Sequence, residues 1–139
     1  MFNYGNPQCG VEEPETYRRN FGLALWQAGY DGAMDYAYQH SFGHEWNDFD
    51  NQSYRDHTMA YPAANGVIDT IQWEGFREGV DDVRYLATLL QAMKTAEAAG
   101  GAKARQAQAT RAWLDKLDMS SADLDVVRAE MIRRILALR

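Results

Sequence analysis

Residues 71–98, IQWEGFREGVDDVRYLATLLQAMKTAEA, decide the fold. Apolar residues recur in this stretch at steps of three and four, at Trp73, Phe76, Val80, Val83, Ala87, Leu90 and Met93. Because one turn of an α-helix takes between three and four residues, this spacing predicts one long amphipathic helix over roughly residues 71–98. Gly100 and Gly101 follow it and are typical of a helix end.

Two further helices are predicted downstream of this segment. Ala102–Leu117 is rich in alanine and weakly amphipathic. A third helix is predicted after Ser120 or Ser121, which are favoured capping residues, with Leu124, Val127, Met131, Ile135 and Leu138 along one face. The sequence therefore predicts a helical tail of two helices over residues 101–139.

Upstream of the long helix, the patterns alternate between strands and a helix. We expect strands at Phe2–Tyr4, Ala33–Gln39 and Thr58–Tyr61, a helix from Pro14 to about Ala28, a long polar loop over 40–56 and a turn at Ala63–Gly66. Such alternation predicts an α/β fold with about three parallel strands.

Composition and charge exclude several classes of protein. The 139 residues contain one cysteine and carry a formal net charge of −6. A single cysteine cannot form a disulfide framework or a four-cysteine zinc site. No apolar run reaches the length of a membrane span, and no signal peptide is expected, so we expect a soluble chain, with no compartment assigned. The acidic balance argues against nucleic acid as a partner.

Aromatic and charged residues are unevenly distributed along the chain. Sixteen of the seventeen Phe, Tyr and Trp residues fall within residues 1–85. Residues 1–100 carry a net charge of −9, whereas residues 101–139 carry +3. We therefore predict two parts: an aromatic, acidic domain over residues 1–100 and the helical tail over 101–139.

The segment from Tyr61 to Leu86 also carries a longer motif. Tyr61-Pro62 and a glycine turn are followed by Glu74, Arg77-Glu78, Gly79, Asp81-Asp82 and Tyr85-Leu86. This pattern resembles the C-terminal domain, of unknown function, of bacterial glycoside hydrolase-like proteins. The same domain ends the barrels of some β-N-acetylgalactosaminidases. The resemblance covers roughly residues 1–95, with Tyr36 where tryptophan is usual and Gln72 where arginine is frequent.

The resemblance implies both a fold and a function. The fold would be the C-terminal portion of a (β/α)8 TIM-like barrel. The family's catalytic acidic pair lies on an earlier strand and has no counterpart here, so no catalytic residue is assigned and the chain is not expected to be active alone. It would contribute to a carbohydrate site, with an N-acetylhexosaminide as the expected ligand and a glycoside hydrolase as the parent protein. An N-terminal barrel segment would then be missing from this chain.

Seven residues are candidates for binding carbohydrate. Sugar rings stack on aromatic faces, which favours a platform of Tyr4, Tyr36, Tyr38, Tyr61 and Trp73, although packing in a core explains the same residues. Asp35 stands between apolar neighbours and needs a partner if it is buried. Glu74, at the start of the long helix, is positioned to accept a hydrogen bond from a sugar or a tyrosine. The alternative for Glu74 and the following carboxylates is a ladder of ion pairs with Arg77 and Arg84.

The loop over 40–56 offers possible metal ligands, but no metal is predicted. Its candidates are His40, His44, Glu45, Asp48, Asp50 and, just beyond, His57. The order of these residues along the chain does not match the HExxH pattern of zinc-binding helices. Gly43 also argues against a helix that would place His40 and His44 on the same face. We expect a polar lid anchored by Trp46 and Phe49, and no cofactor. Cys9 has no partner residues typical of a nucleophile.

Two other functions remain open from the sequence. A partial barrel leaves strand edges that pair readily with another chain, so a structural or oligomerisation module is one alternative, with a homo-oligomer expected. A non-catalytic carbohydrate-binding domain is the other.

Overall fold

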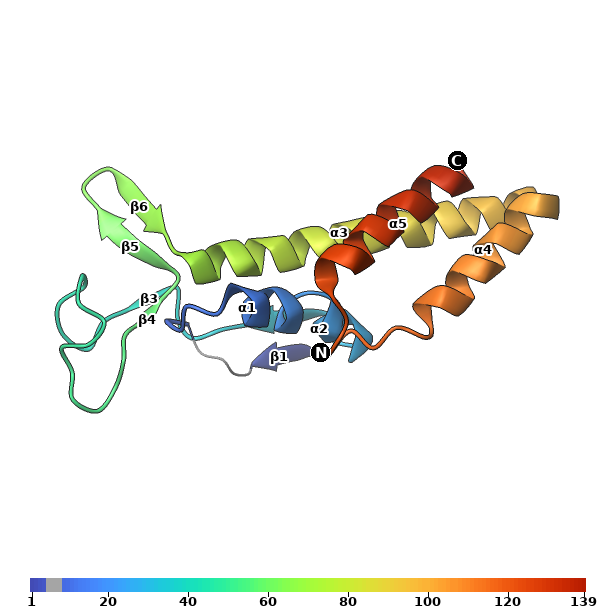
Figure 1. Cartoon of the computed structure of the whole chain (residues 1–139). Helices are drawn as coiled ribbons and strands as arrows, with labels where there is room; N and C mark the ends of the chain where they lie inside the picture. The colour runs from blue at the N-terminus through green and yellow to red at the C-terminus, as the bar shows by residue number, and fades with distance from the viewer. Residues whose placement is uncertain (5–8) are drawn as a thin grey trace. The chain divides into compact units, whose positions relative to one another are not determined.

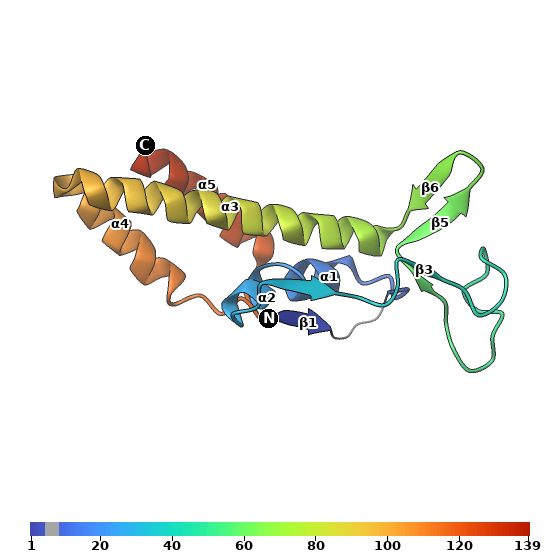
Figure 2. The ribbon, with the colours of Figure 1, turned by 180° about the vertical axis from the view of Figure 1, so that it is seen from behind.

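The computed structural model describes residues 1–4 and 9–139, which form a mixed α/β structure (Figures 1 and 2). They divide into two compact units, Met1–Val80 (unit 1) and Asp81–Arg139 (unit 2). The division falls inside the long helix α3, Ile71–Ala99. It lies upstream of the predicted boundary at residue 100, because the second half of α3 packs with the helices that follow it.

Unit 1 begins with a β-α-β arrangement. Strand β1 (Phe2–Tyr4) pairs in parallel with β2 (Gly32–Met34), and the short helices α1 (Pro14–Asn20) and α2 (Leu23–Gln27) connect them. The predicted single helix from Pro14 is thus interrupted, at Phe21 and Gly22. The predicted strand at Phe2–Tyr4 is confirmed.

The remaining strands of unit 1 pair in antiparallel fashion. Strand β3 (Gln39–His40) pairs with β4 (His57–Thr58), and β5 (Ala60–Ala63) pairs with β6 (Gly66–Asp69). The expectation of three parallel strands is therefore wrong for these pairs. Parallel neighbours need a crossover connection of a dozen or more residues, whereas β5 and β6 are joined by a two-residue turn that permits only antiparallel pairing.

The predicted strand Ala33–Gln39 is split. Its ends belong to β2 and β3, while Tyr36 and Tyr38 lie between them and are exposed. The backbone N–H of Tyr36 donates to the Asp35 carboxylate at 2.9 Å, and its carbonyl accepts from the Cys9 N–H at 3.2 Å. These local bonds replace a strand ladder, which is why the alternation of residues 33–39 did not produce one continuous strand.

Glycines let α1 lie directly on the first turns of α3. A Cβ built on Gly75 would lie 2.2 Å from the Pro14 carbonyl oxygen, and one on Gly79 would lie 2.6 Å from that of Arg18. The core of unit 1 sits beside this contact and consists of Cys9, Tyr17, Phe21 and Met59, with Ala33, Trp73 and Phe76 packed against it. Gly75 and Gly79, both within the segment from Tyr61 to Leu86, therefore have a packing role.

Unit 2 comprises the second half of α3, α4 (Gly101–Leu114) and α5 (Leu124–Leu138). Gly100 and Gly101 adopt φ values of +74° and +59°, the left-handed conformation that ends α3. The apolar face predicted for the last helix is buried, as Leu124, Val127, Met131, Ile135 and Leu138 show. The cap is Asp123, which accepts from two backbone N–H groups, while the predicted serines donate to Asp118.

None of the helices in residues 1–4 and 9–139 is both long enough and apolar enough to span a lipid bilayer.

Candidate functional site

An open cavity of about 320 Å³ lies in unit 1, where β3, β4 and β5 meet the loop over 41–56. We call it the loop cavity. Its volume lies at the lower end of the range for small-molecule pockets. Its wall combines polar residues, Gln39, His40, Ser41, Glu45 and Thr58, with Gly43 and the apolar Ala60 and Pro62. Such a wall can hydrogen-bond a hydroxylated ligand.

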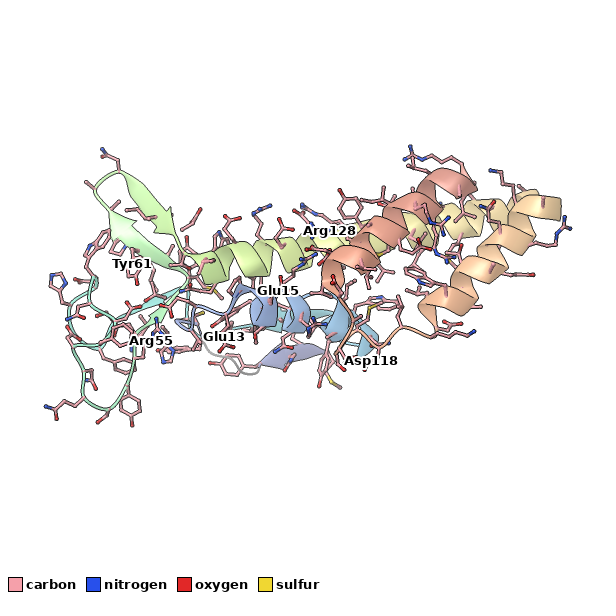
Figure 3. All side chains as sticks on the ribbon, in the orientation of Figure 1. Glu13, Glu15, Arg55, Tyr61, Asp118 and Arg128 are labelled. Carbon is pink, nitrogen blue, oxygen red and sulfur yellow. The ribbon has the colours of Figure 1, made fainter. Side chains whose placement is uncertain are left out.

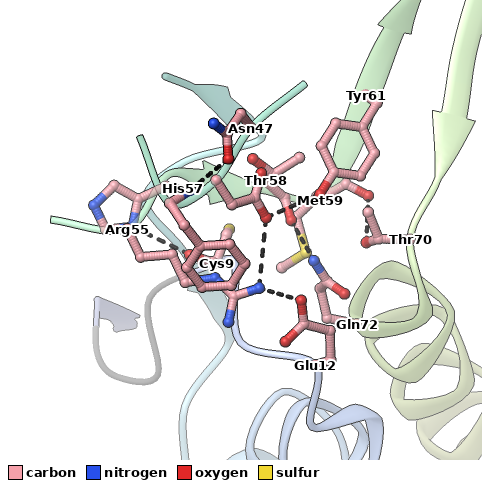
Figure 4. Close-up of polar contacts among 12 residues, drawn as sticks. Cys9, Glu12, Asn47, Arg55, His57, Thr58, Met59, Tyr61, Thr70 and Gln72 are labelled. Carbon is pink, nitrogen blue, oxygen red and sulfur yellow. Dashed lines mark hydrogen bonds and ion pairs between the residues drawn. The ribbon is translucent and has the colours of Figure 1, made fainter. Parts of the chain in front are cut away.

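Hydrogen bonds from side chains to backbone carbonyls hold the strands that line the cavity. The Gln39 side chain donates to the Ala60 carbonyl at 2.8 Å, and the Gln72 side chain donates to the Thr58 carbonyl at 2.6 Å. Thr70, just before α3, donates to the Met59 carbonyl at 2.7 Å (Figure 4). The start of α3 therefore holds β4 and β5 in place.

A buried ion-pair network fastens the loop over 41–56 to the rest of unit 1. Asp48 is 5% exposed; its carboxylate accepts from the Tyr61 hydroxyl at 2.9 Å and from Arg55 at 3.4 Å. Arg55 also pairs with Glu12 (Figure 4). It lies over the Phe49 ring at 4.7 Å. Figure 3 marks Arg55 and Tyr61 on the ribbon. Burial, together with the hydrogen bond to Asp48, raises the pKa of Tyr61 to about 12. The loop is thus held in a defined position.

Trp46 provides a second attachment for the same loop. Its ring stacks on Tyr61 with 5.3 Å between centroids and 13° between planes. About half of the Trp46 surface remains exposed. The structure thus places both predicted lid anchors, Trp46 and Phe49, in contacts with residues that also belong to the Asp48 network.

An aromatic surface extends from the cavity. It consists of five rings in mutual contact, Tyr36, His40, Phe42, Tyr54 and His57. The Tyr36 hydroxyl lies 3.3 Å from His40 Nδ1, and the Phe42 and Tyr54 rings stack at 5.2 Å. His40 belongs both to this surface and to the cavity wall. A ligand in the cavity can therefore continue over exposed aromatic rings.

The predicted platform residues are not brought together into one site. Tyr36 belongs to the aromatic surface and Tyr61 to the loop network. Tyr38 contacts Trp73 edge to face at 5.7 Å, but Trp73 packs against the core and stacks on Phe76, which is the structural alternative considered for it. Tyr4 lies on β1 opposite Met34. None of the seven candidates lines the loop cavity.

The two acidic candidates have different surroundings. Asp35 is partly buried and accepts from the Cys9 thiol at 3.4 Å and from the backbone of Tyr36. Burial raises the pKa of Asp35, and burial together with Asp35 raises that of Cys9, which makes the thiol a poor nucleophile. Glu74 pairs with Arg77 at 2.8 Å, in line with the ion-pair alternative.

Among the described residues, no group of three or more His, Cys, Asp or Glu side chains is arranged to hold a metal ion. His40 and His57 do lie near each other, with 6.1 Å between ring centroids, but they pack among aromatic rings. From the sequence, His40 and His57 are candidates only as metal ligands. The sequence holds one signal for this aromatic surface: His40 and Phe42 are two residues apart, a spacing that places side chains on one face of an extended segment. Tyr54 is distant in sequence, and no pattern links it to them.

No family model matches the chain, and neither a curated protein nor a solved structure is significantly similar to it. Inferences about function therefore rest on the geometry of the described residues.

Proposed function

We propose that unit 1 binds carbohydrate in the loop cavity and on the adjoining aromatic surface, without cleaving it alone. Sugars present hydroxyls that need polar partners and C–H faces that stack on aromatic rings. The cavity wall offers amide, hydroxyl and carboxylate groups. The aromatic surface offers the rings.

The observation that carries this proposal is the double role of His40. His40 is one of the residues that line the cavity, and its ring contacts Tyr36, Phe42 and His57. The cavity and the aromatic surface therefore adjoin at His40. A ligand longer than one sugar unit would use both parts.

The proposal that the site is not catalytic by itself rests on its carboxylates. Glycoside cleavage ordinarily uses a pair of carboxyl groups that flank the scissile bond. Among the residues that line the cavity, Glu45 is the one carboxylate.

We also propose that β1, α1, α2 and β2 correspond to the last strands of a glycoside hydrolase-like (β/α)8 barrel. Two supports are the parallel pairing of β1 with β2 and the helical connection between them, since both are the repeating features of such barrels. The parent protein would then hydrolyse an N-acetylhexosaminide. Turnover of aryl N-acetylhexosaminides by that parent would support this idea, and the lack of both turnover and binding would contradict it.

Ligand-observed NMR with a panel of mono- and disaccharides tests carbohydrate binding directly. Tyr36→Ala and His40→Ala are expected to weaken binding several-fold, because they remove parts of the aromatic surface. Tyr85→Ala, at an exposed aromatic residue of unit 2, is the matched control and should bind like the parent protein. Absence of binding across the panel, or full binding by Tyr36→Ala, would contradict the proposal.

Self-association is a second candidate function, and the β1–β2 sheet favours it. Phe2, Tyr4 and Met34 lie on one face of this sheet and are each more than half exposed. Parallel sheets are almost always covered on both faces, and two strands alone are marginal. We expect a homo-oligomer that buries this face. Light scattering at micromolar concentration tests it: a monomer contradicts it, and Tyr4→Glu should dissociate the oligomer.

A further inference from the structure

The wall of the loop cavity carries one formal charge. Glu45 is the anionic residue among those that line it, and none of the lining residues is Lys or Arg. Glu45 has no ion-pair partner within residues 1–4 and 9–139. The cavity therefore presents an uncompensated carboxylate to whatever enters it.

The residues around the cavity add to this negative field. The loop over 41–56 contains four acidic residues and one basic residue, Arg55. Arg55 is engaged by Glu12 and Asp48, so its charge is already matched. Asp56 is 1% exposed, and its carboxylate accepts one backbone N–H, that of Phe42 at 2.8 Å. Oδ2 of Asp56 has no hydrogen-bond partner among the described residues. Clefts lined by one sign of charge concentrate ligands of the opposite sign.

Aromatic rings reinforce the preference for a cation. Tyr36 and Phe42 are exposed, and both contact His40 at the cavity wall. The faces of such rings attract ammonium groups. A cavity that carries a carboxylate and adjoins exposed aromatic rings at His40 is thus suited to a protonated amine.

We propose that the loop cavity selects sugars that carry a free, protonated amine over their N-acetylated and carboxylated counterparts, with Glu45 as the partner of the ammonium group. This inference rests on the proposed carbohydrate site and specifies its ligand class. For the loop cavity it replaces the N-acetylhexosaminide that the resemblance implies as ligand. An acetamido group has no charge for Glu45 to pair with, and a sugar carboxylate would be repelled by it.

Calorimetric or NMR titration of the full chain with glucosamine, N-acetylglucosamine and glucuronic acid tests this, at about pH 7, where an amine of this kind is mostly protonated, a glutamate ordinarily ionised and an imidazole ordinarily neutral. We expect glucosamine to bind about two- to fivefold more tightly than N-acetylglucosamine, the range for an exposed ion pair. Glucuronic acid should bind most weakly. Added salt should reduce the affinity for glucosamine and leave that for N-acetylglucosamine nearly unchanged.

Glu45→Gln separates the charge from the rest of the site. This variant should bind glucosamine no better than N-acetylglucosamine, with the affinity for N-acetylglucosamine retained. Glu97→Gln, on an exposed turn of α3 in unit 2, is the matched control and should keep the preference.

Three outcomes would overturn the inference. In the first, both sugars bind equally to the parent protein; in the second, Glu45→Gln keeps the preference. Either result leaves the carbohydrate site itself standing. In the third, ethanolamine binds as tightly as glucosamine, which would show a site for amines rather than for sugars. Failure of every sugar to bind would instead refute the proposed function, and the inference with it.

Discussion

Replacing Gly75 with alanine tests the contact between α1 and α3. The added Cβ would lie 2.2 Å from the Pro14 carbonyl oxygen, 2.6 Å from its Cα and 2.7 Å from its carbonyl carbon. All three are backbone atoms, which cannot rotate away as the end of a side chain can. Because comfortable contacts between such atoms lie at about 3.5–4.0 Å, one helix must shift by more than about 1 Å.

The expected cost follows from two opposing effects. Overpacking a tight interior typically costs about 1–3 kcal/mol, and rigid backbone neighbours place Gly75→Ala at the upper end. Alanine is better than glycine inside a helix by about 1 kcal/mol, which offsets part of that cost. The free energy of unfolding of unit 1 should therefore fall by about 2 kcal/mol.

Urea unfolding followed by tryptophan fluorescence measures this change. Trp26, Trp46 and Trp73 lie in unit 1 and Trp113 in unit 2, so a Trp113→Phe background restricts the signal to unit 1. Gly66→Ala is the control, because nothing lies within 4 Å of a Cβ built there. If Gly75→Ala proved as stable as the parent or more so, helix propensity would outweigh the clash and the described packing would be refuted.

Three further predictions concern charged groups. Burial raises the pKa of Asp35, so its contribution to stability is fully present below its unfolded pKa and is lost as pH rises through the folded pKa. Asp35→Asn should therefore flatten the acid side of a stability–pH profile and stabilise the protein at pH 7; a destabilised variant would contradict this. Arg128→Leu removes the ion pair between Arg128 and fully buried Asp82, which lie 2.5 Å apart, and should cost unit 2 about 3 kcal/mol in urea unfolding. A loss of stability near zero would show that other groups compensate the charge of Asp82. The pKa of Glu12 is lowered chiefly by its hydrogen bond from Arg55, so this tether weakens as pH falls through the folded pKa. Glu12→Gln should speed proteolysis within residues 41–56, with global stability changed by less than about 1 kcal/mol; unchanged cleavage would contradict this role.

Helical segments were predictable because their pattern is local. The apolar spacing from Trp73 onward gave α3 to within one residue of its observed C-terminus, Ala99. The buried face of α5 was predicted correctly as well. Long amphipathic stretches encode their own structure, since each turn repeats the same signal.

Strand pairing was less predictable because it depends on distant partners. Ala33–Gln39 alternates like a strand, yet hydrogen bonds of Asp35 and Cys9 with Tyr36 interrupt it. The residues of β6, including Val67 and Ile68, were not assigned to a strand, although the turn before them was identified. In a strand of only four residues, contacts with neighbouring segments decide whether the strand forms.

The candidate site was predictable only in part. Aromatic enrichment pointed to residues 1–85, and Tyr36 does lie in the aromatic surface. The cavity, however, is lined by residues from β3, β4, β5 and the loop, with Glu45 and Thr58 among them. Their proximity arises from antiparallel pairing, which the pattern of alternating strands and helices did not indicate.

The stack of Trp46 on Tyr61 makes the loop over 41–56 optically observable. Two aromatic chromophores 5.3 Å apart and nearly parallel couple their electronic transitions, and this coupling decays steeply with separation. A near-ultraviolet circular dichroism band that disappears in Tyr61→Leu would report the stacking of Trp46 on Tyr61 without any added label. Following that band during titration with a ligand would show whether Trp46 moves away from Tyr61 as the cavity fills.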